Sequence, residues 1–167
     1  LVAANLTQGS VTFIDTANRR AFASGPTTAV NLRGVAVFPN GRRVYVVGQR
    51  AQNERPTETA IGIWSNQAFV QVPNGRPNTV DNIWLDLLSD EVSDPDSVVL
   101  DQGLTRAYMT CTGGHSVLVS GLRSEENVTI REVGACPKGL TFTPDQRELW
   151  VANNLSNDVA VIDPATL

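Results

Sequence analysis

The sequence contains few of the residues that build catalytic or metal centres: its 167 residues include one histidine, two cysteines and one methionine. A zinc or copper site with two histidines cannot be made from this chain alone, because His115 is the only histidine. The nucleophile-elbow, phosphate-loop and H-E-x-x-H patterns are also missing. We therefore assign no catalytic, cofactor-binding or metal-binding residue, and the sequence favours a non-catalytic role.

Long apolar runs and an excess of positive charge are absent as well. No stretch of eighteen apolar residues occurs, so no membrane-spanning helix is predicted. The net charge is −4 at pH 7, which disfavours a general nucleic-acid surface. With 41% hydrophobic and 18% charged residues, the composition is that of an ordinary globular protein.

What the sequence does contain is a repeat of short apolar runs divided by turns. Residues 34–46, 97–109 and 139–151 align with one another, and an aromatic residue falls at Tyr45, Tyr108 and Trp150. These markers lie 63 and 42 residues apart, and the N-terminal stretch repeats the pattern of 150–163, with Leu1 placed 44 residues before Tyr45. A period in the low forties that is built from short strands is typical of propeller blades.

On these residues the chain resembles the YVTN-type β-propeller repeat family of bacterial surface and periplasmic proteins. Pro137-Lys138-Gly139, Pro144-Asp145-Gln146 and the run 149–153 fit the motif of that family, as do Pro39-Asn40-Gly41 and 44–47. The copy at Asp101-Gln102-Gly103 departs from the motif because it lacks the proline. The resemblance implies a fold and leaves the activity open, because such propellers perform many functions.

The sequence thus predicts an all-β fold, with 1–167 forming one segment of a β-propeller of four-stranded antiparallel blades. We expect two whole and two partial blades of a larger propeller. Their bounds are 1–24 for the first partial blade, 34–72 for the second blade, 97–133 for the third and 139–167 for the last partial blade. Such an arc would leave unpaired strand edges and a bare blade face at each end.

The second blade is predicted to carry insertions at 48–59 and 73–96, around strands at 60–64 and 69–72. Within the second insertion, apolar residues follow helical spacing, which predicts an amphipathic helix. They are Val80, Ile83, Trp84, Leu87 and Leu88. The helix either packs on its own blade or docks a partner. The candidates for a partner interface are Ile83, Trp84, Leu87 and Leu88.

Two other groups of residues each have two interpretations. Asp86, Asp90, Glu91, Asp94 and Asp96 form either a calcium site or a solvated acidic loop. Cys111 and Cys136 lie at the ends of predicted strands in adjacent blades, so a disulfide between them is a candidate that would imply an oxidising compartment. The alternative is a pair of reduced thiols.

For function, the prediction is a secreted, cell-surface or periplasmic propeller that acts as a non-catalytic scaffold and binds protein, without nucleic acid and without a membrane span. The alternative is the propeller platform of a periplasmic redox enzyme or of a cytochrome-associated electron-transfer protein, because YVTN-like propellers resemble the heavy subunits of quinone-cofactor amine dehydrogenases. A lactonase-type propeller hydrolase would need acidic metal ligands around a central channel, and we place no such set.

Overall fold

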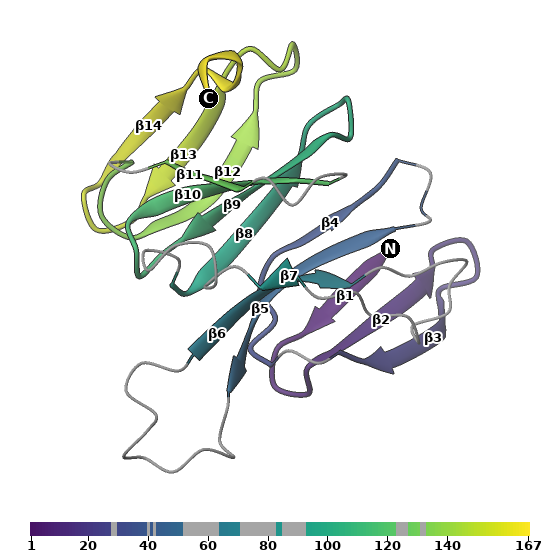
Figure 1. Ribbon diagram of the computed structural model, residues 1–167. Helices are drawn as coiled ribbons and strands as arrows, with labels where there is room; N and C mark the ends of the chain where they lie inside the picture. The colour runs from purple at the N-terminus through teal and green to yellow at the C-terminus, as the bar shows by residue number, and fades with distance from the viewer. Residues whose placement is uncertain are drawn as a thin grey trace, which may run out of the picture. The chain divides into compact units, whose positions relative to one another are not determined.

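The computed structural model describes residues 1–27, 30–39, 41, 43–51, 64–70, 83–84, 93–122, 127–130 and 133–167. Within these residues the chain is all-β, with one short 3-10 helix at Pro164–Thr166. The strands form four antiparallel sheets in two compact units, Leu1–Asp86 and Leu87–Leu167, and each unit holds two sheets (Figure 1). No helix in the described part of the chain has the length and apolar character needed to cross a membrane.

The first unit consists of a three-stranded and a four-stranded sheet. The three-stranded sheet has the order β1-β2-β3, with β1 at Val2–Asn5, β2 at Ser10–Asp15 and β3 at Arg20–Pro26. The four-stranded sheet has the order β4-β5-β6-β7, with β4 at Val35–Val37, β5 at Val44–Ala51, β6 at Trp64–Val70 and β7 at Ile83–Trp84.

The second unit also pairs a four-stranded with a three-stranded sheet. The first has the order β11-β10-β9-β8, with β8 at Pro95–Leu100, β9 at Arg106–Cys111, β10 at Ser116–Gly121 and β11 at Asn127–Ile130. The second has the order β12-β13-β14, with β12 at Pro137–Phe142, β13 at Leu149–Asn153 and β14 at Asp158–Ile162. These two sheets lie in the ranges predicted for the third blade, 97–133, and the last partial blade, 139–167, although β8 and β12 begin two residues earlier.

In the sheet β4–β7 the predicted strands are partly wrong. Strands were expected at 60–64 and 69–72, but the described residues 64–70 form the single strand β6; the rest of the two ranges lies outside the described residues. Residues 48–51 continue β5 instead of opening an insertion. The fourth strand is β7, in which Ile83 pairs with Ala68 and Trp84 pairs with Gln67. The predicted helix is therefore wrong at these two residues. A short apolar run fits both the helical and the strand periodicity, and at Ile83 and Trp84 the pairing with β6 produces a strand.

The repeat predicted from the sequence appears as one hydrogen-bonded turn that occurs three times among the residues that the structure describes. In each copy, the residue before the turn donates its backbone N–H to the carbonyl five residues on, and its own carbonyl accepts from the N–H three residues on. The outer pairs are Phe38 with Arg43, Asp101 with Arg106, and Thr143 with Glu148, at 2.9, 3.2 and 2.9 Å. The residue three positions on has positive φ in all three copies: Gly41, Leu104 and Gln146.

Strand register confirms that the three aromatic markers are equivalent. Each marker lies near the start of the second strand of its sheet and pairs with a residue of the first strand. The pairs are Tyr45 with Ala36, Tyr108 with Val99, and Trp150 with Thr141. In the first sheet, Val2 pairs with Phe13 as Tyr108 pairs with Val119. In the first sheet, Val2 is therefore the residue equivalent to the aromatic markers. The sequence alignment had placed Leu1, one residue earlier, at this position.

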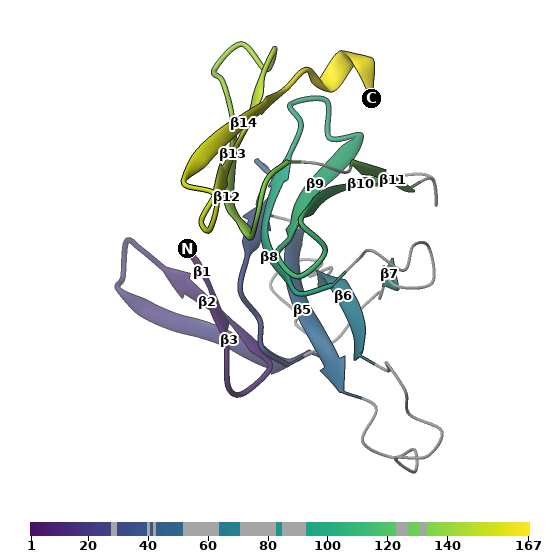
Figure 2. The same cartoon turned by 90° about the vertical axis from the view of Figure 1, so that its left-hand side faces the viewer.

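Each unit has its hydrophobic core between its two sheets. In the first unit Val11 and Phe13 of β2 pack with Val44 and Val46 of β5, together with Leu32. The core of the second unit combines β9 and β10 with β13 and is completed by Val133; its strand residues are Tyr108, Val117, Val119, Leu149 and Val151. Figure 2 shows the sheet β12–β14 lying against the sheet β8–β10 within the second unit.

Candidate functional site

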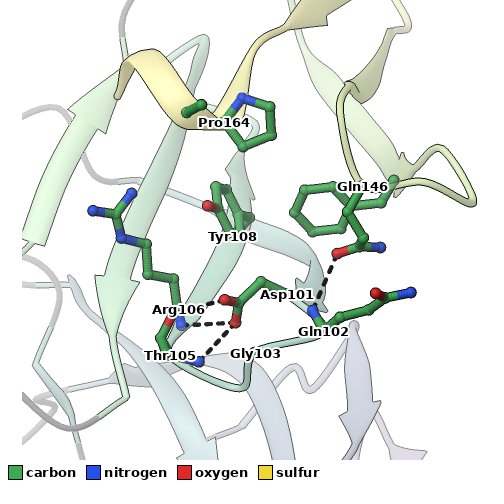
Figure 3. Close-up of a pocket in the computed structure, with 10 residues that line it drawn as sticks. Asp101, Gln102, Gly103, Thr105, Arg106, Tyr108, Gln146 and Pro164 are labelled. Atoms are coloured by element: carbon green, nitrogen blue, oxygen red, sulfur yellow. Dashed lines mark hydrogen bonds between the residues drawn. The ribbon is translucent and has the colours of Figure 1, made fainter.

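A cavity of about 380 Å³ opens in the second unit beside the turns that follow β8 and β12. The short 3-10 helix at the C-terminal end of β14 closes one side of it (Figure 3). Its lining comes from both sheets of the unit: Asp101, Gln102, Gly103, Thr105, Arg106, Tyr108, Phe142, Gln146, Pro164 and Ala165.

The floor of the cavity is organised by the carboxylate of Asp101. Its Oδ1 accepts the backbone N–H of Thr105 at 2.8 Å and that of Arg106 at 2.9 Å, while its Oδ2 accepts the Thr105 hydroxyl at 2.6 Å. In the equivalent turn of the next sheet, the Thr143 hydroxyl accepts the backbone N–H of Glu148 at 3.1 Å. The aspartate thus closes the turn of the one copy that lacks the motif proline, and its carboxylate is engaged in that structural task.

Two contacts join the walls of the cavity. The Tyr108 and Phe142 rings meet edge to face, with centroids 5.0 Å apart and an interplanar angle of 88°. Gln146 Oε1 accepts the backbone N–H of Gln102 at 3.1 Å, which ties the turn after β8 to the turn after β12. The cavity is therefore held by fixed links between the two sheets.

Arg106 gives the cavity its chemical character. Across the described residues, the guanidinium of Arg106 forms no ion pair and no side-chain hydrogen bond. Figure 3 shows it extending along the side of the cavity toward which the Tyr108 hydroxyl also points. Since a guanidinium offers several N–H donors in a planar fork, this arrangement suits a carboxylate or another small anion. Sequence reasoning missed this cavity, and its only sequence signal was the missing proline at 101–103.

The single histidine, His115, lies in the turn between β9 and β10, at the end of β9 that is away from the cavity. His115 Nδ1 accepts the backbone N–H of Cys136 at 3.0 Å, and the Thr112 hydroxyl donates to the carbonyl of Pro137 at 2.9 Å. These bonds join the turn after β9 to the chain that enters β12. His115 acts here as a structural link between the two sheets.

The predicted disulfide is not formed, because both cysteines are free. Cys111 is fully buried at the end of β9, opposite Ser116 of β10, and burial raises the pKa of its thiol to about 12. Cys136 is half-buried in a turn with φ of 58°, where its backbone is held by His115. The inference of an oxidising compartment from these cysteines therefore loses its support.

The acidic group and the partner-interface candidates are only partly described. Asp96 forms an ion pair with Lys138 at 3.1 Å, while Asp86, Asp90 and Glu91 lie outside the described residues. In the part of the chain that the structure describes, no three His, Cys, Asp or Glu side chains gather where they could hold a metal ion. Calcium binding by this group stays a prediction.

Of the interface candidates, Ile83 and Trp84 form β7, while Leu87 and Leu88 lie outside the described residues. The place of β7 at the edge of its sheet gives the two described candidates a strand position instead of a helical one. Their use as a partner interface stays a prediction.

Comparison with known proteins finds likeness only among solved structures. No protein-family model matches the sequence, and no curated protein matches it. In contrast, 202 chains of solved structures match, so the fold by itself does not single out one activity.

Two of these structures cover almost the whole chain. Hydrazine synthase from Kuenenia stuttgartiensis matches with a TM-score of 0.86 and 25% identity over 98% of this chain and 55% of that chain. A functionally unknown protein from Desulfotomaculum acetoxidans matches with a TM-score of 0.64 and 14% identity over 98% of this chain and 48% of that chain. This chain therefore spans about half the length of each, and its likeness to the hydrazine synthase supports a β-propeller-like fold.

Proposed function

We propose that this chain belongs to a non-catalytic β-propeller scaffold of the YVTN type, which positions a protein partner. The observation that supports the propeller in this proposal is the match to hydrazine synthase over 98% of the chain with a TM-score of 0.86. The non-catalytic role rests on the sequence, in which we find no catalytic constellation. The three copies of one turn support a repeat architecture, because each copy has the same pattern of backbone hydrogen bonds. As part of the same proposal, the protein works at the cell surface or in the periplasm, like the family that its motifs resemble.

The alternative form of the proposal is the propeller platform of a periplasmic redox enzyme or of a cytochrome-associated electron-transfer protein. The likeness to hydrazine synthase, at 25% identity, favours it. In this form the propeller holds and orients the component that carries the redox centre, and the centre itself lies in that component. The groups described in this chain would then contribute binding surface and rigidity.

Within this proposal, the cavity beside Arg106 is the contact point for an acidic side chain of the partner. The walls of the cavity are fixed by the Tyr108–Phe142 contact and by the hydrogen bond of Gln146, so little ordering cost arises on binding. The guanidinium of Arg106 supplies charge complementarity to a carboxylate. Because the cavity is open to solvent, this contact contributes more to specificity than to affinity.

The ultraviolet–visible spectrum of the protein purified from its source separates the two forms. A haem or quinone band that co-elutes with the propeller through successive columns is expected for the redox platform. A preparation with protein absorbance alone, and with a colourless partner bound in fixed ratio, leaves the general scaffold. A preparation that carries neither chromophore nor partner contradicts both forms.

Variants of the purified complex test which surface is used. Arg106→Gln is expected to weaken retention of the partner, while the matched control Arg147→Gln, on an exposed arginine outside the cavity, is expected to leave it unchanged. Trp84→Ala tests β7 in the same assay. If partner retention is lost with unchanged thermal stability, β7 is a docking strand. If only stability falls, β7 completes its sheet.

A further inference from the structure

One face of the sheet β12–β14 is apolar and open to solvent. Trp150 is 46% exposed, Val159 53% and Val161 55%, whereas the residues that alternate with them along β13, Leu149 and Val151, are buried. Trp150 pairs with Val161 of β14, and Val159 lies two residues before Val161 on that strand, so it faces the same side of the sheet. The three side chains therefore form one continuous patch, which we call the open face.

The same positions exist in the neighbouring sheet of the same unit. The pair Tyr108 and Val119 has the register of Trp150 and Val161, and Val117 has the place of Val159. Tyr108, Val117 and Val119 are 2%, 0% and 3% exposed. The open face is thus a second copy of a face that this chain buries elsewhere.

What buries the equivalent face is the back of the next sheet. Tyr108 meets Phe142 of β12 edge to face, and the cluster around Tyr108 includes Leu149 and Val151 of β13 together with the partly buried Leu140. The first unit repeats this arrangement, since Val11 and Phe13 of one sheet pack with Val44 and Val46 of the next. In each unit, the face equivalent to the open face packs against the first two strands of the next sheet. In the first unit these strands are β4 and β5, which contribute Val35, Val44 and Val46.

The polar group on the open face is already satisfied. The indole Nε1 of Trp150 donates to Glu148 Oε2 at 2.8 Å, and Glu148 lies immediately before β13. Burial of the face beneath an apolar surface therefore leaves no indole N–H without an acceptor. No described strand pairs with the outer edge of β14, so a fourth strand of this same sheet could pair there.

From this register equivalence we infer that the open face is covered, in the working protein, by the back of a further sheet of the same repeat within the same propeller. The occupant carries large aliphatic or aromatic residues at the positions of Leu140 and Phe142 and aliphatic residues at those of Leu149 and Val151. The lengths of the two neighbouring structures agree with this, because this chain spans 55% and 48% of them. The inference concerns how the propeller is completed and does not depend on the proposed redox role.

The test compares the 167-residue chain with the polypeptide encoded by the whole reading frame, each with Trp64→Phe and Trp84→Phe so that Trp150 is the only tryptophan. Acrylamide is the probe of exposure. We expect several-fold weaker quenching and a blue-shifted emission in the whole polypeptide, and strong, concentration-independent quenching in the 167-residue chain. Equal quenching in the two proteins would overturn the inference. Shielding of the 167-residue chain that disappears on dilution would show that a second copy is the cover, and would also overturn it.

Paired substitutions protect the test from misfolding of one variant. Val161→Arg is expected to lower the melting temperature of the whole polypeptide and to leave that of the 167-residue chain unchanged. Leu155→Arg, at an exposed leucine in the turn between β13 and β14, is the matched control and should change neither. If Val161→Arg leaves the whole polypeptide unchanged, the open face is not a sheet interface.

Discussion

The sheets β8–β11 and β12–β14 have the same turn and the same strand register, yet one of their equivalent faces is buried and the other is exposed. Tyr108 is 2% exposed and packs on Phe142, while Trp150, at the same position, is 46% exposed. The larger aromatic residue is the more exposed one, so residue type does not decide burial here. The difference arises from whether a neighbouring sheet lies on the face.

The largest expected effect sharpens this contrast directly. Tyr108→Ala removes a buried aromatic ring and should destabilise the second unit by about 3–5 kcal/mol. Trp150→Ala in the same 167-residue chain should cost about half as much, because 46% of this residue is already exposed to water. Urea unfolding followed by hydrogen exchange of β9 and β13 amides measures both values. Equal losses for the two variants would break the comparison.

A second contrast concerns the asparagines that end two equivalent strands, β1 and β13. Asn153 is buried and donates from Nδ2 to the Val133 carbonyl and to Asp158 Oδ1, whereas the part-buried Asn5 donates to the hydroxyls of Ser10 and Thr12. Asn153→Ala should cost about 1–3 kcal/mol, since it leaves the buried Val133 carbonyl without this donor. For Asn5→Ala we expect a smaller loss in the same urea experiment, because water can reach the two hydroxyls. A larger loss at Asn5 would contradict this account.

The cysteines offer a contrast in reactivity rather than in stability. Because burial raises the pKa of Cys111 to about 12, we expect iodoacetamide at pH 8 to label the half-buried Cys136 in the folded protein and to leave Cys111 unmodified. In denaturant without reductant, both thiols should react, as mass spectrometry of the labelled chain would show. Absence of labelling in denaturant would reinstate the predicted disulfide.

The smallest expected effect is the pH response of the turn after β12. The Thr143 hydroxyl, and then the backbone N–H of Arg147, lower the pKa of Asp145 below its ordinary value. This contribution to stability is complete above the ordinary aspartate pKa and is lost as the pH falls through the lowered one. Asp145 is exposed, so the change in stability is small. In an NMR titration, Thr143→Ala should move the Asp145 midpoint upward, whereas an unchanged midpoint would contradict the assigned cause.

Local patterns were sufficient wherever short-range pairing decides the structure. The short apolar runs divided by turns predicted the sheets β8–β11 and β12–β14, because neighbouring strands joined by short turns pair with each other. The aromatic markers at Tyr45, Tyr108 and Trp150 also defined the repeat, and strand register confirmed them. The prediction failed in the second sheet, where β7 pairs with β6 across a long connection that no local signal specifies.

The candidate site lay beyond the reach of local patterns. The cavity is formed when the turns after β8 and β12, which are about forty residues apart, meet through Gln102 and Gln146. Arg106 stands out only because no described acidic side chain reaches it in three dimensions. The cysteines illustrate the same point, since their positions at strand ends suggested a bond that the packing of Cys111 against β10 does not make.

The sequence by itself determined the all-β class, the repeat and the turn that each copy uses, because these depend on residue alternation and on backbone hydrogen bonds between near neighbours. Only the tertiary structure decided which apolar faces are buried, which thiol is shielded and where polar groups converge. Those properties depend on contacts between sheets, and one-dimensional spacing does not contain them. Trp150 and Tyr108 share a pattern and a register, and only the presence of a packed neighbour separates them.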